Sequence, residues 1–372
     1  MKTVIVFDLS ELTAWKGPLP LPPNTPVVDS VPVARRRLPP AALAVPAAGL
    51  VLAALAAVSL GPVSVPWPDV LDAIATRGGA GVPHAALVWD VRVPRVLVAA
   101  MVGAALAVAG AVMQAVFRNP LADPGITGVS SGAAVGAVAV LVTGTSVFGS
   151  ATLPLGAFLG AAVTMIALLV VTRLRRDASP MTLVLVGITL GSFCSALTAV
   201  LVANASEDSA VRSVVFWVNG DLTARVWGDV YLCTVPILVG TAILLSRHRV
   251  LDAMLLGERT ATSLGVDVRR QQLLLLLAGA LVTGAAVAVT GVIGFVGLVI
   301  PHAVRLIAGP RHAMLLPAAM LSGAAFLVLA DLGARLMFDP VVLQTGTVAA
   351  LVGSPVFGYL VLRRGSGHEG AA

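Results

Sequence analysis

The chain is poor in lysine and in charged residues of any kind. Lys2 and Lys16 are its only lysines, and charged residues make up 11% of its 372 positions. Soluble domains carry about 25% charged residues, so the composition argues against a water-exposed globular protein. A P-loop requires a lysine on the nucleotide phosphates, and neither lysine lies in a glycine-rich loop. The sequence therefore predicts that this chain contains no P-loop ATPase.

Cysteine is also scarce. Cys194 and Cys233 lie in apolar segments without neighbours at ligand spacing, so they are expected to be small core residues. The N-terminal apolar run, VIVF before Asp8, is shorter than a secretory h-region, so no cleaved signal peptide is expected. Neither a metal site nor a disulfide is predicted.

Hydrophobic residues dominate, at 58% of the chain and a mean hydropathy of +0.98. A hydrocarbon core roughly 30 Å thick needs about 20 helical residues, and many apolar runs approach that length. We predict an all-α polytopic membrane protein with about ten transmembrane helices. They are expected at 41–60, 95–117, 126–143, 153–172, 181–203, 229–247, 269–289, 292–308, 315–335 and 344–362. The run at 292–308 is expected to be a broken or short span.

Three parts of the chain are defined by these segments. Residues 1–40 are rich in proline and polar residues, which predicts a disordered cytoplasmic extension. Residues 41–364 form the transmembrane domain, and 365–372 a cytoplasmic tail. The net charge of +6 comes from arginines clustered between apolar runs, and most of the 24 cations fall on one side of the predicted topology. The positive-inside rule then places both termini in the cytoplasm, and no nucleic-acid binding is expected.

One long stretch carries a family signature. Arg92 to Gly132 contains an R-x-P-R sequence, an apolar helix rich in small residues, and the turn RNPLADPG. In this order the three features resemble the FecCD family, the permease subunits of ABC importers for iron–siderophore, haem and cobalamin. The resemblance extends to Phe357.

The resemblance implies a type II ABC importer permease fold and a function. The chain would be the bacterial inner-membrane subunit that moves a metal chelate into the cytoplasm, with ferric siderophore expected first and haem or cobalamin as alternatives. The implied partners are two copies of an ABC ATPase, an extracytoplasmic substrate-binding protein, a second permease (identical or paralogous) and the lipid bilayer. ATP and Mg would be bound by the ATPase, so no cofactor and no catalytic residue is expected in this chain.

The segment 252–268 lies between two predicted helices on the cytoplasmic side. Its spacing predicts a compact amphipathic pair of short helices, which suits docking into a groove on another protein. It resembles the family's coupling pattern, L-G-E-x-x-A-x-x-L-G, at Gly257, Glu258, Ala261, Leu264 and Gly265. Glu258 is expected to anchor the contact with the ATPase, and Ala261 and Leu264 to fill its apolar floor. The alternative is an ordinary connecting loop.

Arg92, Arg95 and Arg335 are three of the six arginines on the predicted outer side. The resemblance implies that they meet acidic residues of the binding protein, in exposed pairs that contribute about 0.2–1 kcal/mol each and fix orientation. The alternative for Arg92 and Arg95 is snorkelling to lipid headgroups. Arg335 has another, pairing with Asp331 one helical turn earlier.

The cytoplasmic turn comprises Arg118, Asn119, Pro120, Leu121, Ala122, Asp123, Pro124 and Gly125. Its two prolines and glycine predict a fixed non-helical path, and Asp123 can cap the helical segment after it. The turn is expected to shape the inner mouth or to buttress the coupling segment, or to be purely structural.

Small residues recur four apart at Gly103 and Ala107, Gly132 and Gly136, Gly156 and Gly160, and Gly187 and Gly191. They allow close helix contact, and packing within the chain is favoured over a dimer or gate surface.

His302 and Arg305 share a helix face. Because no second ligand accompanies His302, we predict that it is an interfacial residue rather than a metal ligand.

Two residues near the C-terminal helix depart from the family pattern. Val342 and Gln344 replace the family's acidic residue and proline before Gly346, which puts the helix start there in doubt.

An ion-coupled secondary transporter would need an ionisable group inside the membrane, and Asp331 is the single candidate. A membrane-embedded enzyme is disfavoured because no cluster of His, Asp and Glu is visible.

Overall fold

The computed structural model describes residues 41–79, 81, 83–174, 180–205, 207–337 and 341–365. The predicted extension at 1–40 and residues 366–372 of the predicted tail lie outside these ranges. Within them the chain is helical, and no strand occurs among the described residues. The helices run α1 (Ala41–Ser59), α2 (Trp67–Ala75), η2 (Leu87–Arg92, a π-helix), α3 (Val93–Val116), η3 (Pro124–Thr127, a 3-10 turn), α4 (Val129–Thr143), η4 (Gly149–Ala151), α5 (Thr152–Leu174), α6 (Pro180–Ala203), α7 (Asp208–Val218), α8 (Trp227–Ser246), α9 (His248–Leu255), α10 (Glu258–Ser263), α11 (Val268–Thr290), α12 (Val296–Ala308), α13 (His312–Leu336) and α14 (Thr345–Gly365).

Each of the ten predicted helices has a counterpart. Seven helical stretches in the described residues are long and apolar enough to cross a membrane: α1, η2 with α3, α5, α6, α8, α11 and α13. The apolar parts of α4, α12 and α14 are shorter. The prediction of a short span at 292–308 is confirmed, because α12 has only 13 residues and Gly291–Phe295 are not helical. Phe295 has a φ of 67°, so the chain turns sharply before α12.

Two helices lie at the centre of the bundle. α3 and α11 are largely buried, whereas α6 exposes most of its length. The exposed residues of α6 are apolar, among them Leu185, Ile188 and Phe193. An apolar surface of this extent is stable only against lipid or another protein.

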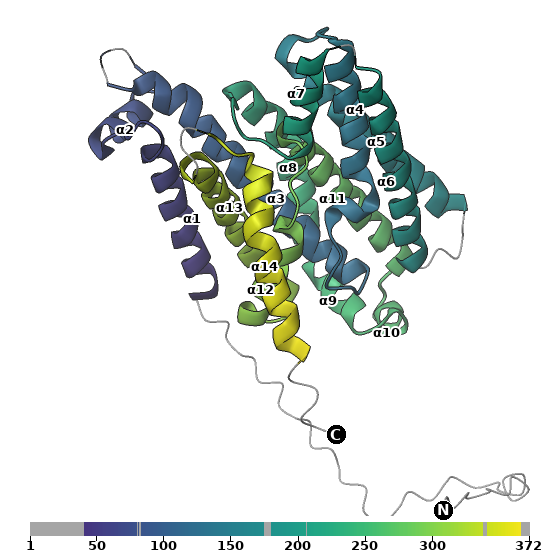
Figure 1. Cartoon of the computed structure of the whole chain (residues 1–372). Coiled ribbons are helices and arrows are strands. Elements are labelled where there is room, and N and C mark those ends of the chain that lie inside the picture. The colour runs from purple at the N-terminus through teal and green to yellow at the C-terminus, as the bar shows by residue number, and fades with distance from the viewer. Residues whose placement is uncertain are drawn as a thin grey trace, which may run out of the picture. The chain divides into compact units, whose positions relative to one another are not determined.

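The ends of the bundle differ (Figure 1). α9 and α10 lie at one end, where α13 begins, and α2 and α7 lie at the other. We call these the α10 end and the α7 end. α2 was not predicted from the sequence, because its nine residues are too few to form an apolar run that could span a bilayer.

Glycines bring the helix backbones together. A Cβ at Gly103 of α3 would overlap the carbonyl oxygen of Gly323 of α13, and one at Gly110 would overlap the carbonyl oxygen of Gly297 of α12. Gly136 of α4 meets Gly156 of α5 in the same way. The prediction that the small-residue pairs pack within the chain is therefore confirmed for these helices.

A single methyl group should show how tight this packing is. We expect Gly110→Ala to lower the free energy of unfolding by about 1–3 kcal/mol, because the backbone of α12 must move away. Gly49→Ala is the matched control: a Cβ added at Gly49 of α1 would have no neighbouring atom within 4 Å, so the change should be neutral or stabilising by up to about 1 kcal/mol. Thermal unfolding in detergent measures both. Equal stability of the two variants would contradict the packing argument.

Candidate functional site

The predicted coupling segment is a pair of short helices, as expected. α9 and α10 meet at Gly257, whose φ of 111° is accessible only to glycine without strain. Gly265, after α10, also has a positive φ, at 82°. The two glycines in the motif thus define the turns on either side of α10.

The segment has an exposed head and a buried base. Glu258 and Gly265 are exposed, and Leu264 is 64% exposed, as docking requires. Leu255 and Leu256 are also exposed beside them. The head therefore presents the Glu258 carboxylate, further polar residues of α10 and three exposed leucines.

Ala261 corrects the prediction. It was expected to contact a partner, but it is completely buried within the chain. Its spacing from Glu258 places it on the inner side of α10, where α10 packs on α9 and α11. A methyl group suits this position because a larger side chain would lift α10 away from the base.

The base of the segment is held by α9. Leu251 and Met254 are fully or almost fully buried, and α9 packs against both α3 and α13. Arg118 of the cytoplasmic turn donates from Nη2 to the carbonyl oxygen of Met254, over 3.2 Å. The turn thus buttresses the coupling segment, one of the roles predicted for it.

The turn itself is held by side-chain hydrogen bonds. Asn119 Oδ1 accepts from the amide of Leu121 at 2.9 Å, and Asp123 Oδ1 accepts from the amide of Gly125 at 2.8 Å. Asp123 is the N-cap of η3, as predicted, and Pro124 begins that turn. Burial raises the pKa of the Asp123 carboxyl above its ordinary value, while the Gly125 amide acts in the opposite direction.

The three outer arginines lie at the α7 end but are buried there. Arg92, Arg95 and Arg335 are only 4%, 7% and 6% exposed, and Asp331 is 1% exposed. The expectation of exposed docking pairs is wrong for this conformation. With Asp331 and Thr345, these residues form what we call the arginine cluster.

Asp331 is the centre of the arginine cluster. Arg95 donates to it from two nitrogens, at 2.9 and 2.8 Å. Arg335 approaches it at 3.3 Å, so the alternative pairing one helical turn away is confirmed. Thr345 Oγ1 donates to the same carboxylate at 3.0 Å, which fixes the start of α14. That start, where the sequence departs from the family pattern, is also held by a hydrogen bond from the amide of Gly346 to the Gly220 carbonyl.

The remaining arginine donors cap α1. Arg92 donates from Nη1 to the carbonyl oxygens of Val58 and Ser59, at 2.7 and 2.9 Å, and from Nη2 to Val63. Arg335 reaches the carbonyl of Ala57 at 3.1 Å. Helix C-termini leave carbonyl groups unsatisfied, and cations there are favourable. The docking role of these arginines stays a prediction, but each of them already makes hydrogen bonds within the chain.

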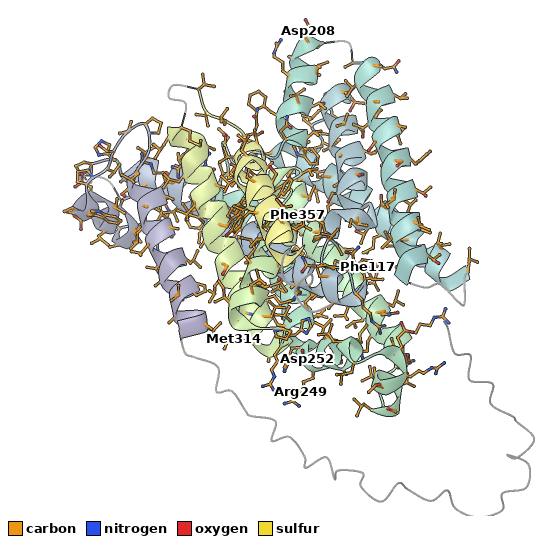
Figure 2. The ribbon with its side chains drawn as sticks, turned by 60° about the horizontal axis from the view of Figure 1, so that its bottom comes forward. Phe117, Asp208, Arg249, Asp252, Met314 and Phe357 are labelled. Atoms are coloured by element: carbon orange, nitrogen blue, oxygen red, sulfur yellow. The ribbon has the colours of Figure 1, made fainter. Side chains whose placement is uncertain are left out.

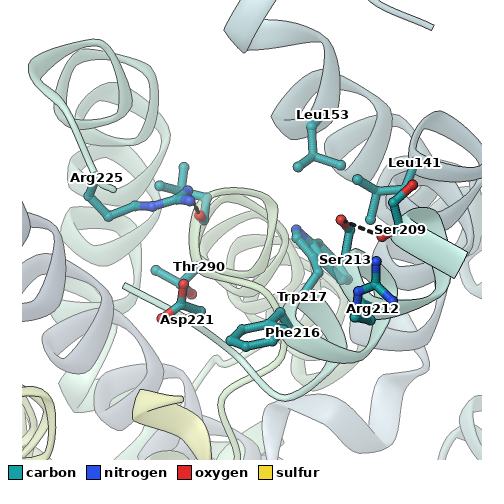
Figure 3. A pocket seen from close by; sticks show the side chains of 11 residues that line it. Leu141, Leu153, Ser209, Arg212, Ser213, Phe216, Trp217, Asp221, Arg225 and Thr290 are labelled. Atoms are coloured by element: carbon teal, nitrogen blue, oxygen red, sulfur yellow. Dashed lines mark hydrogen bonds between the residues drawn. The ribbon is translucent and has the colours of Figure 1, made fainter. Parts of the chain in front are cut away.

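A second feature of the α7 end was not predicted as a site. The amphipathic helix α7 lies at this end, and a cleft opens beside it (Figure 3). The cleft is lined by Leu141, Leu153, Ser209, Arg212, Ser213, Phe216, Trp217, Asp221, Arg225, Val289 and Thr290. Arg225 donates to the Val289 carbonyl and lies 4.0 Å from Asp229, whereas Arg212 is exposed. The cleft at the α7 end is thus lined in part by cationic and aromatic side chains.

His302 occupies a helix interface. Its ring is buried and lies edge-on to Phe357 of α14, with the centroids 6.2 Å apart (Figure 2 labels Phe357). Arg305, on the same face of α12, donates to Gln114 Oε1 of α3 at 3.0 Å. Among the described residues no group of three or more His, Cys, Asp and Glu side chains is placed to hold a metal ion. The interfacial role predicted for His302 agrees with this placement.

The arginine cluster depends on its single carboxylate. We expect Asp331→Asn to lower the free energy of unfolding by about 3–5 kcal/mol, because two buried guanidinium groups lose their counter-charge. Asp267→Asn is the control: Asp267 pairs with Arg270 at an exposed site and caps α11, and asparagine caps equally well. That change should cost less than about 1 kcal/mol. Similar losses for the two variants in a thermal unfolding assay would argue against the cluster's importance.

Known proteins resemble this chain in sequence and in fold. The chain is 42% identical over 325 residues to the cobalamin import system permease protein BtuC of Halobacterium salinarum, covering 87% of this chain and 86% of that protein. It is 39% identical over 310 residues to the Fe(3+) dicitrate transport system permease protein FecD of Escherichia coli, covering 83% and 94%. A solved inward-facing conformation, assigned to a metal-chelate type ABC transporter, superimposes with a TM-score of 0.78 at 32% identity, covering 86% of this chain and 98% of that one. Residues 49–363 match the FecCD transport family, and the chain belongs to that family of membrane permeases.

Proposed function

We propose that this chain is the permease subunit of an ABC importer that moves a metal chelate into the cytoplasm. The observation that carries the proposal is the coupling segment, with its exposed head on α10 and its buried base on α9. An exposed head that carries Glu258 and Leu264, on a base that packs against α3 and α13, suits the transfer of motion from another protein. Family membership supports the same role.

The partners follow from this assignment. Two ATPase subunits, which bind ATP and Mg, dock at the α10 end. That end faces the cytoplasm of a bacterial cell, and both termini of the chain are cytoplasmic. A second permease, identical or paralogous, and lipid cover the exposed apolar surface that includes α6. The substrate-binding protein docks at the α7 end. Because the arginines of the cluster are buried and bonded within the chain, the binding protein would first meet α7 and the cleft beside it.

The cargo is a metal chelate, and we propose a ferric siderophore. The relatives named for cobalamin and for ferric dicitrate, together with the metal-chelate type of the solved transporter, support the class. Cobalamin and haem are the alternatives within it.

The rival, an ion-coupled carrier, has less support. Asp331 was its candidate coupling group, but this carboxylate already accepts hydrogen bonds from Arg95 and Thr345 and pairs with Arg335. A coupling carboxylate must exchange a proton or ion during transport. Asp331 is placed to hold helices together instead.

Isolation of the complex tests the assignment directly. We expect the tagged chain, extracted from native membranes in mild detergent, to co-purify with a P-loop ATPase at about one copy per permease, since the family couples through such a partner. Mass spectrometry identifies the partners and shows whether the second permease is identical. Recovery of the chain alone across several detergents would favour the secondary transporter.

Reversal of one charge tests the coupling segment. We expect Glu258→Arg to abolish ATP-driven uptake, measured in proteoliposomes with a radioiron-labelled ferric hydroxamate, and in parallel with haem and cyanocobalamin. The exposed position of Glu258 predicts that the variant still folds. Arg259→Glu, at the next exposed position, shows whether any charge reversal on α10 has the same effect. Normal transport by Glu258→Arg would refute the role of this residue.

A further inference from the structure

The coupling segment makes a polar contact with the first turn of α13. Asp252 of α9 accepts two hydrogen bonds on the same oxygen, Oδ1, from His312 at the start of α13. The backbone amide of His312 donates over 2.9 Å and its ring Nδ1 over 2.7 Å. Because a carboxylate oxygen only accepts, Nδ1 carries the proton. The two residues are 60 positions apart in the sequence.

This contact takes the place of a helix cap. The N-cap residue of α13 is Arg311, whose side chain makes no capping hydrogen bond and has no acceptor atom to make one. Asp252 therefore supplies from α9 the acceptor that α13 lacks, at the end of the helix where the dipole favours a negative charge. The His312 ring is 1% exposed, and its Nε2 meets no hydrogen-bond partner within the described residues. Asp252 is thus the polar contact that fixes the ring.

α13 is placed to carry a displacement across the bundle. It runs for 25 residues from His312 to Leu336, and Asp331 lies about 28 Å from His312 along a helix with a rise of 1.5 Å per residue. Between these two ends, Gly323 packs directly on the backbone of α3. At the α7 end, Asp331 ties α13 to α3 and to the start of α14. A displacement of the first turn of α13 would therefore be felt by the helices around the arginine cluster.

We propose that Asp252 and His312 form the joint through which the coupling segment moves α13 during transport. The inference rests on the proposed function, since it needs an ATPase that acts on α10. The two residues are positioning residues: they touch neither cargo nor nucleotide, and they act by keeping α9 and the first turn of α13 together. Figure 2 shows Asp252 at the end of the molecule where α13 begins, near Met314.

The experiment compares transport with hydrolysis in the full complex of permease, ATPase and binding protein in proteoliposomes. Asp252→Leu keeps the approximate size of the side chain and removes the acceptor. We expect it to lower uptake per ATP hydrolysed by roughly tenfold, within the range of known coupling between distant sites, while basal hydrolysis and ATPase binding stay unchanged. The cargo is whichever of radioiron-labelled ferric hydroxamate, haem and cyanocobalamin the wild type takes up.

Three further variants separate the joint from a general effect on folding. Asp252→Asn keeps an oxygen for both hydrogen bonds, so its transport should resemble that of the wild type. His312→Phe keeps a buried ring and the backbone hydrogen bond but removes the ring donor, so it should give an intermediate loss, and it replaces Asp252→Leu if that variant is not recovered folded. Arg249→Leu, at an exposed position of α9, is the matched control and should transport normally.

The possible outcomes are distinct. Normal uptake per ATP in Asp252→Leu would overturn the joint and leave the proposed function intact. Loss of the ATPase from the Asp252→Leu complex would also overturn it, because the pair would then support docking rather than transmit motion. Absence of ATP-driven uptake in the wild-type complex would overturn the proposed function and the joint together.

Discussion

In hydrocarbon, one apolar side chain gains little by leaving lipid for another, so the helices of this chain need another reason to stay together. Glycine provides it, by allowing the backbones of α3, α12 and α13 to touch at Gly110 and Gly323. Dispersion over these close contacts replaces the hydrophobic effect as the main attraction. α3 and α11 are largely buried in the bundle, whereas α6 exposes most of its apolar length.

Close packing leaves little room for polar side chains between the helices. This chain places several of them at helix ends, where they form hydrogen bonds and ion pairs. At the α7 end, Arg92 caps α1 while Arg95, Arg335 and Thr345 surround Asp331. At the α10 end, Asp252 caps α13. A buried carboxylate or guanidinium without partners would cost several kcal/mol, and Asp331 and the three arginines find donors or acceptors on other helices. The same contacts therefore stabilise the bundle and connect its two ends.

Much of the fold could be predicted because its signals are local. A run of apolar residues about one bilayer thick is helical wherever it occurs, since only internal hydrogen bonds satisfy the backbone there. A short span at the position of α12 was predicted because the last apolar runs follow one another closely in the sequence. The cap at Asp123 and the turns at Gly257 depend on residues within a few positions of each other. α2 was missed because it is short and lies outside the long apolar runs from which the helices were predicted.

By itself the sequence determined the class of protein, the positions of the helices and the coupling segment with its exposed Glu258, because composition, apolar length and local motifs specify these features. The tertiary structure alone decided which of the candidate site residues are exposed and which are buried. Arg92 and Arg95 precede an apolar helix, where sequence suggests an exposed flank, yet neighbouring helices cover them; Ala261 is covered in the same way. The partners of Arg95 and of Asp252 lie 236 and 60 positions away. Only packing brings such residues together, and burial is a property of that packing rather than of local sequence.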